Sequence, residues 1–74
     1  MQTVGEKAVG LSFNPSREPD VNEIKKLYAR IIDLCDGNRA STNTTPEARR
    51  LYSIAITEAQ GAQMWAVKAI TWKD

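Results

Sequence analysis

The segment from Pro46 to Trp72 constrains the fold most, because its pattern is that of one long helix with apolar residues on nearly every face. Alanines recur along it mostly at intervals of three and four residues, at Ala48, Ala55, Ala59, Ala62, Ala66 and Ala69. Such a row of small side chains lets a second helix approach closely. A helix that is apolar nearly all round is typically buried. We therefore expect other helices, above all from further copies of the chain, to cover this segment.

The chain is short for a stable single domain, and its composition leaves few ways to compensate. A chain of 74 residues buries only about 60% of the surface that its unfolded form exposes. Small domains commonly depend on disulfides, a structural metal or oligomerisation. Cys35 has no partner for a disulfide, and without histidine the usual zinc-ligand sets are missing. The sequence therefore predicts no metal and no cofactor, a core position for Cys35, and a homo-oligomer formed through the long C-terminal helix.

A shorter helix is predicted over residues 20–36. Asp20 is its expected N-cap, and Gly37 is its expected C-cap. Its apolar residues recur at alternating intervals of three and four, which is the period of one helix face. These residues are Val21, Ile24, Tyr28, Ile31 and Cys35.

A polar loop over 37–45 separates the two helices. Thr45 is the expected cap of the long helix, 46–73, and Pro46 takes its first position. The predicted fold is therefore mainly α, with an antiparallel two-helix hairpin in a single domain that spans 1–74.

Residues 1–19 are expected to form an extended N-terminal arm. Gly5 and Gly10 argue against a helix there, and the two prolines near its end exclude a long one. Apolar residues alternate with smaller ones in the period of a strand, at Val9, Leu11 and Phe13. We expect this arm to lie over the hairpin or over a neighbouring protomer.

The two predicted helices differ in length. At 1.5 Å per residue the long helix would extend about 40 Å and the short one about 25 Å, which leaves an overhang of about 15 Å. Depending on register, the overhang would carry Trp65 and Trp72, or Leu51 and Tyr52. Because such large side chains would form an exposed apolar patch, we expect the arm or a neighbouring chain to cover them.

The charge pattern excludes several function classes. Ten basic and nine acidic residues give a net charge of +1 without a run of one sign, whereas a protein that binds duplex nucleic acid is normally much more basic. The N-terminus lacks the pattern of a secretory signal, and no segment is apolar enough to span a membrane. We therefore expect a cytoplasmic protein.

The residues of common enzyme sites are missing. There is no histidine to act as a base, and Ser53 and Thr57 have no activating group nearby in the sequence. No glycine-rich phosphate loop or paired-carboxylate motif occurs. The sequence therefore predicts that the chain is not an enzyme, with a carboxylate pair assembled between subunits as the open alternative.

Basic residues close to aromatic ones suggest a binding role. A ligand with phosphates and bases needs charged donors for one part and a flat apolar face for the other. Each candidate also has a structural interpretation, as core packing, as a solvated face, or as a pair with Glu47 or Glu58. The candidates are Phe13 and Asn14 in the arm, Lys25, Lys26 and Arg30 in the shorter helix, Arg49 and Arg50 at the start of the long helix, and Lys68 near its end.

Three stretches of the chain resemble a known family. They are FNPS at 13–16, VNEIKKLYARIIDL at 21–34 and SIAITEAQGAQMWAVKAITW at 53–72. These stretches resemble the small bacteriophage proteins that inhibit CBASS and Thoeris immunity, the anti-CBASS and anti-Thoeris cyclic-nucleotide sponges, which share a helical hairpin domain. The resemblance extends over roughly 9–72, nearly the whole chain.

The resemblance implies a non-catalytic protein that captures a nucleotide alarm signal in the host cytoplasm before an effector reads it. Family members assemble as dimers or hexamers, of which we favour the hexamer here. They bind cyclic dinucleotides, cyclic trinucleotides or cyclic ADP-ribose isomers between protomers, where an aromatic residue stacks on a base and basic residues hold phosphates. On the matching positions, Phe13 and Asn14 become candidates for base contact, Arg49 and Arg50 with Lys25 or Lys26 for phosphate contact, and Arg30 and Lys68 are further candidates.

Two other functions stay open at this point. The first is a purely structural or protein-interaction module, an oligomeric hairpin without a small-molecule ligand. The second is a small nucleic-acid binder, whose affinity would depend steeply on salt.

Overall fold

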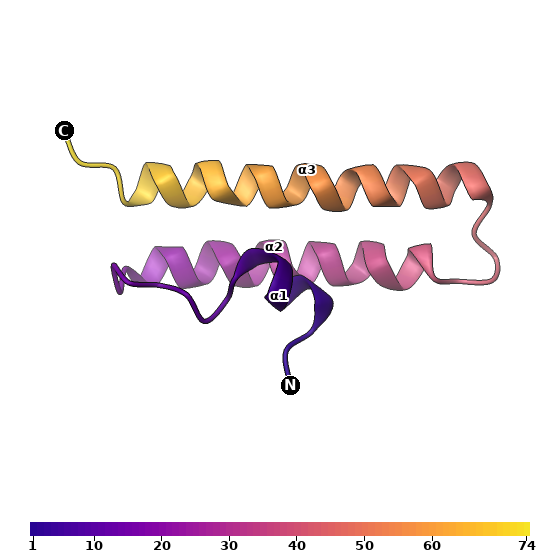
Figure 1. Cartoon of the computed structure of the whole chain (residues 1–74), viewed down its shortest axis with the longest axis horizontal. Helices are drawn as coiled ribbons and strands as arrows, with labels where there is room; N and C mark the ends of the chain where they lie inside the picture. Colours follow the sequence, from indigo (N-terminus) through magenta and orange to yellow (C-terminus); the bar gives the residue numbers. More distant parts are fainter.

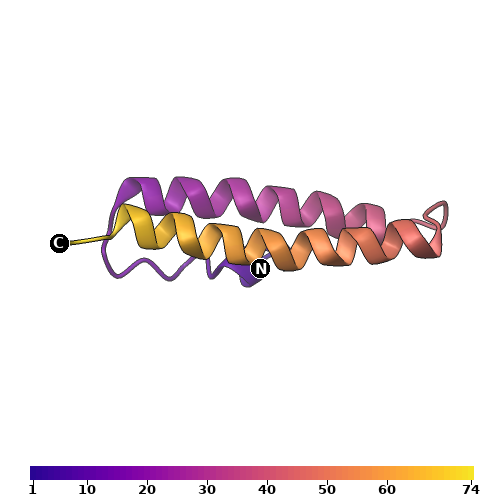
Figure 2. The ribbon, with the colours of Figure 1, turned by 90° about the horizontal axis from the view of Figure 1, so that it is seen from above.

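The fold is a helical hairpin with a short third helix on one of its faces. The structure, a computed structural model, describes residues 1–74. It contains α1 (Val4–Val9), α2 (Pro19–Arg39) and α3 (Pro46–Ile70) and no strands. α2 and α3 lie antiparallel, joined by a loop at one end (Figure 1). Seen from above, α1 and the segment after it lie on one side of this pair (Figure 2). The prediction of a mainly helical hairpin is confirmed, with three helices instead of two.

α2 extends beyond the predicted range 20–36 at both ends. Its N-cap is Glu18, without a side-chain hydrogen bond, and Pro19 lies in its first turn, so the assignment of Asp20 as the cap was wrong. The helix also continues through Gly37, which does not adopt the left-handed conformation of a helix-ending glycine. A glycine inside a helix costs only about 1 kcal/mol relative to alanine, which neighbouring contacts can offset.

α3 begins as predicted and ends earlier than predicted. The hydroxyl of Thr45 accepts a hydrogen bond from the Ala48 N–H at 3.2 Å, and Pro46 follows the cap. The helix ends at Ile70, short of the predicted range 46–73. With 25 residues in α3 and 21 in α2, the lengths differ by only about 6 Å. The large overhang expected from the sequence is therefore absent.

The first half of the arm, 1–19, is helical, so the expectation of an extended arm was wrong there. Thr3 caps α1 through its hydroxyl, which accepts from the Glu6 N–H at 3.1 Å, and the Glu6 carboxylate accepts from the Thr3 N–H at 2.8 Å. Gly10 ends the helix with φ 63°, a left-handed conformation that glycine adopts freely. α1 buries Val9 in the core.

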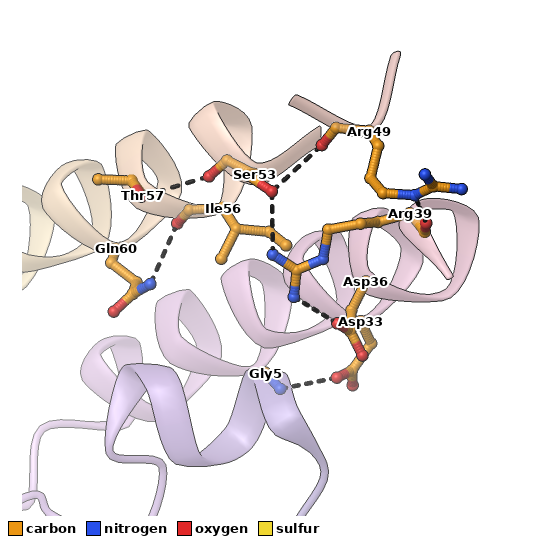
Figure 3. Close-up of polar contacts among 9 residues, drawn as sticks. All are labelled: Gly5, Asp33, Asp36, Arg39, Arg49, Ser53, Ile56, Thr57 and Gln60. Carbon is orange, nitrogen blue, oxygen red and sulfur yellow. Dashed lines mark hydrogen bonds and ion pairs between the residues drawn. The ribbon is translucent and has the colours of Figure 1, made fainter. Parts of the chain in front are cut away.

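α1 docks on α2 through Gly5. Its N–H donates to the Asp33 carboxylate at 2.7 Å (Figure 3). A Cβ at Gly5 would lie 2.0 Å from the backbone oxygen of Ala29, a distance that no real side chain can adopt. The glycine that argued against a helix is therefore the residue that allows this helix to touch α2.

Gly5→Ala is expected to lower the free energy of unfolding by about 1–3 kcal/mol, because the added methyl group must push α1 away from α2. Urea denaturation measures the loss, and hydrogen exchange should show α1 as the segment that becomes unprotected. Gly61→Ala is the matched control: a Cβ there meets no atom within 4 Å, and alanine should stabilise α3 by up to about 1 kcal/mol. Equal losses in the two variants would contradict the docked position of α1.

The core of the single chain is thin. Nine of its 74 residues are buried, which is little for a stable domain. Cys35 packs against the central cluster, as predicted. The buried apolar residues are Val9, Val21, Ala29, Ile32, Ile56 and Ala59.

Within one chain α3 is buried along one face only. Its buried residues are Ile56, Ala59 and Gln63, so most of the alanine row remains accessible. Exposed large apolar side chains lie on both long helices, as Leu27, Ile31 and Leu34 of α2 and Leu51, Ile54, Met64 and Trp65 of α3, with Trp72 just beyond it. Coverage of α3 by further copies therefore remains a proposal.

Candidate ligand-binding site

Residues 10–18 form a strap that runs from α1 to the end of the hairpin where α2 begins and α3 ends (Figure 1). Phe13, in this strap, is 68% exposed. Beneath the strap lies a mainly apolar cavity of about 290 Å³, lined by Phe13, Asn14, Pro15, Ser16, Val21, Val67 and Thr71. An accessible aromatic ring at the rim of an apolar cavity offers a flat surface on which a base can stack.

Asn14 fixes the turn within the strap. Its amide nitrogen donates to the Glu18 carbonyl at 3.0 Å and to the Asn22 side chain at 3.2 Å, and its amide oxygen accepts from the Ser16 hydroxyl at 2.8 Å. Arg17 follows with φ 58°, a left-handed conformation uncommon for a residue other than glycine. A base contact by Asn14 would have to replace one of these hydrogen bonds.

The side chain of Lys25 points inward, and its ammonium forms hydrogen bonds with the strap. Its ammonium donates to the carbonyls of Gly10 and Phe13 and lies 5.6 Å from the centre of the Phe13 ring. Of the two neighbouring lysines that the sequence offered for phosphates, this one has little free donor capacity.

Lys26 and Arg30 lie together on the side of α2 that carries α1. They line a groove of about 370 Å³ with the acidic residues Glu6 and Asp33, and with Leu27 and Ala29. The backbone N–H groups of Thr3 and Gly5 already bind those two carboxylates. Neither cation takes part in an ion pair of the structure, although the carboxylates of Glu6 and Asp33 lower the net charge of the groove. We call this site the α1–α2 groove.

Arg49 braces the interhelical loop at the opposite end of the hairpin. Its guanidinium donates to the Arg39 carbonyl at 3.0 Å and the Thr44 carbonyl at 3.2 Å. Arg39 in turn donates to Asp36 and Ser53 and so joins α2 to α3 (Figure 3). Arg49 therefore has a structural role within the single chain.

Arg50 forms a two-bond ion pair with Glu47, at 2.6 and 3.1 Å. Hydrogen bonding to the guanidinium holds the pKa of Glu47 below its ordinary value, and the same contact raises the pKa of Arg50. Both side chains are exposed, so the pair is screened by water and weak. Glu47 is thus the partner that the sequence suggested for one of these arginines.

Within one chain Lys68 lies beside aromatic rings, and its pairing with Glu58 of a neighbouring helix stays a prediction. Its ammonium lies 5.4 Å from the Trp65 ring and 5.9 Å from the Trp72 ring, within the range of a cation–π contact. The indole N–H of Trp72 donates to Asp74 at 3.0 Å. Lys68 therefore belongs to an exposed aromatic cluster on the outer side of the C-terminal region.

Apart from Lys68, the predicted residues fall into two groups within one chain. Phe13, Asn14, Lys25, Lys26 and Arg30 lie in the strap and the first half of α2. The two arginines of α3 lie beside the far end of α2, about four turns or 20 Å from Lys25 along the helix axis. A single chain therefore does not bring the aromatic candidate and these arginines into one pocket.

Several residues at this site were not among the candidates predicted from the sequence. The apolar cavity wall formed by Val21 and Val67 depends on contacts between distant segments, which no local pattern reveals. Glu6 and Asp33 enter the α1–α2 groove only because α1 is helical. The Thr3–Glu6 spacing of a capping box was the available signal for that helix.

The structure shows neither a metal-binding cluster nor a membrane-crossing element. It has no group of three or more histidine, cysteine, aspartate or glutamate side chains placed to hold a metal ion. None of its helices has both the length and the apolar composition that crossing a membrane requires.

Comparison with known proteins gives one match. The family model described as "Acb2/Tad1, hairpin domain" matches residues 6–71, which includes the strap, both long helices and all eight candidate residues. No curated protein and no solved structure gives a significant match.

Proposed function

Because the chain belongs to the Acb2/Tad1 hairpin-domain family, we propose that it binds and sequesters a cyclic nucleotide immune signal without converting it. The ligand class comprises cyclic dinucleotides, cyclic trinucleotides and cyclic ADP-ribose isomers. By holding such a signal in the cytoplasm of an infected bacterium, the protein would inhibit CBASS or Thoeris defence. The family is a binding domain and not a known enzyme family.

The observation that carries this proposal is the exposed Phe13 ring beside an apolar cavity, in a chain whose Lys26 and Arg30 line a second groove, between α1 and α2. Stacking of a base on an aromatic ring contributes about 1–3 kcal/mol. Hydrogen bonds between a cation and a phosphate contribute about 1.5–3 kcal/mol each. One stacked base and a few such bonds are enough for tight binding.

We further propose that the working form is a homo-oligomer, with a hexamer favoured and a dimer possible. The support is the thin core of the single chain and the apolar residues left exposed on α2 and α3. Packing between protomers would also allow Arg49 and Arg50 of one protomer to approach the strap of another. Lys68, which lies beside Trp65 and Trp72, would then provide a further cation for the ligand.

A thermal-shift panel tests the proposed function. The purified protein is heated with cyclic dinucleotides, cyclic trinucleotides and cyclic ADP-ribose isomers, with the matching linear dinucleotides as controls. At least one cyclic ligand at micromolar concentration should raise the melting temperature, because a ligand that binds only the folded state stabilises it. No shift with any of them would remove the proposal and leave the oligomeric interaction module as the alternative.

The double variant Lys26→Gln/Arg30→Gln tests the role of the α1–α2 groove in the same thermal-shift panel. It should lose most of the shift, because it removes the two cations of the α1–α2 groove. Lys73→Gln is the control, since this lysine lies near the exposed C-terminus, outside the site. An equal loss per removed charge in the two variants would mean that only net charge matters.

Glu47→Gln is expected to strengthen ligand binding a few-fold, if Arg50 of a neighbouring protomer contacts phosphate. The substitution releases Arg50 from its ion pair, which is exposed and therefore weak. Calorimetry measures the change in affinity, and the gain should vanish when Arg50 is also replaced by glutamine. Unchanged affinity in Glu47→Gln would exclude Arg50 from the phosphate contacts.

A further inference from the structure

We propose that Lys25 is a positioning residue that holds the strap, and with it the Phe13 ring, while the neighbouring Lys26 is the lysine that meets the ligand. The link to ligand binding rests on the proposed function. The fixing of the strap by Lys25 stands independently of it.

The contacts of Lys25 all lead to the strap. The residue is 6% exposed. Its ammonium donates to the Gly10 carbonyl at 3.0 Å and to the Phe13 carbonyl, and the Phe13 ring lies over it at 5.6 Å. Two carbonyls and one ring face therefore surround a single cation, and Phe13 supplies both a carbonyl and the ring.

No carboxylate compensates the buried charge of Lys25, because the ion pairs of the structure lie elsewhere. A buried cation without partners is strongly unfavourable. The carbonyls of Gly10 and Phe13 are therefore what makes burial of this ammonium tolerable. Lifting the strap would remove them, so the closed strap and the buried lysine stabilise each other.

The opposite helix does not provide the partner either. Lys25 donates to no acceptor of α3, because both of its hydrogen bonds lead to the carbonyls of Gly10 and Phe13. Gln63 is 5% exposed, and its amide oxygen has no hydrogen-bond partner. A buried acceptor of α3 thus stays unused, while the ammonium donates to the strap.

Lys26 differs from Lys25 both in its exposure and in its contacts. Successive residues of a helix point about 100° apart, so one lysine enters the interior and the next lies in the α1–α2 groove. Lys26 is exposed and takes part in no ion pair. The two lysines therefore form a natural pair of variants, in which one substitution should disturb the strap and the other should not.

The test combines hydrogen exchange without ligand and calorimetry with ligand, for Lys25→Met and Lys26→Met. In the closed strap the N–H groups of Phe13 and Arg17 donate to the Gly10 and Asn14 carbonyls. In Lys25→Met these two amides should exchange about tenfold faster or more, the change expected on losing a charge-assisted hydrogen bond. Amides of the α3 core should keep their rates. In Lys26→Met the strap amides should be unchanged.

Ligand affinity should fall in both variants. Lys25→Arg keeps a positive charge at this position, so it should retain the protection of the strap amides and part of the affinity. Unchanged strap exchange in Lys25→Met would overturn the inference. If the unmodified protein binds no cyclic nucleotide, the proposed function fails, while the exchange result still decides the role of Lys25.

A measurement on the unmodified protein covers the case in which Lys25→Met does not fold. In the proton–nitrogen NMR spectrum of the side-chain ammonium groups, Lys25 should give a resolved signal, because its protons are buried and hydrogen-bonded. Lys26 should give none, because its protons exchange with water. Rapid exchange of the Lys25 ammonium protons with water would contradict the role of Lys25 in holding the strap.

Discussion

Replacing Ile32 with alanine is expected to lower the free energy of unfolding by about 2–5 kcal/mol, the cost of a large-to-small change in a packed core. Ile32 is 0% exposed and lies in the central cluster with Ala29 and Ile56. Because small domains are stable by only about 5–15 kcal/mol, this single change should remove much of the stability of the hairpin. Urea denaturation at a fixed protein concentration measures it.

Ile31→Ala is the matched control, since the neighbouring isoleucine is 47% exposed. In dilute solution it should change the free energy of unfolding by no more than about 0.5 kcal/mol. If further copies cover this face of α2, the same variant should weaken assembly in light scattering, and its stability should fall further behind that of the unmodified protein as protein concentration rises. If both variants lost the same free energy of unfolding at high dilution, the orientation of α2, with Ile32 buried and Ile31 exposed, would be contradicted.

Replacing Phe13 with alanine should weaken ligand binding about 5- to 150-fold, the equivalent of the 1–3 kcal/mol that one stacked base contributes. Its ring is mostly exposed, so the melting temperature without ligand should change little. Calorimetry with the ligand found in the thermal-shift panel measures the effect.

Phe13→Tyr is the control for this prediction. It keeps a flat aromatic face and the backbone carbonyl that Lys25 binds, so it should retain most of the affinity. An affinity in Phe13→Ala equal to that of the unmodified protein would show that the ring does not contact the ligand.

The hairpin could be predicted because its signals are local. Thr45 and Pro46 mark the start of α3 through a side-chain cap and a fixed backbone angle, and the three-and-four period marks both long helices. Gly37 shows the limit of this reasoning, since a glycine ends a helix only where the chain turns left-handed. Whether it does so depends on the residues that follow and on packing.

The N-terminal segment was mispredicted because one of its glycines allows a contact with a distant segment and the other ends a helix. Gly5 permits α1 to touch α2 at Ala29, and Gly10 ends α1 before the strap. Both were counted as signs against a helix. The capping pair of Thr3 and Glu6 pointed the other way and was the stronger local signal.

The binding candidates could be predicted by type, but their roles could not. Lys25 and Lys26 are equivalent in the sequence, and only the strap, which folds back on one of them, distinguishes the two. Arg49 is likewise a loop contact within the chain, a role that depends on the Arg39 carbonyl. Which of these residues touch a ligand depends also on how protomers pack, which remains part of the proposal.

The proposed function requires that the protein bind a cyclic nucleotide signal and release it unchanged. The most direct test incubates the protein in excess with the ligand, separates free ligand by ultrafiltration, then heats the retained protein and analyses the released material by chromatography. The filtrate should be depleted of ligand, and the heated sample should release the intact cyclic nucleotide. Ligand that stays in the filtrate, or that appears as a linear or hydrolysed product, would contradict it.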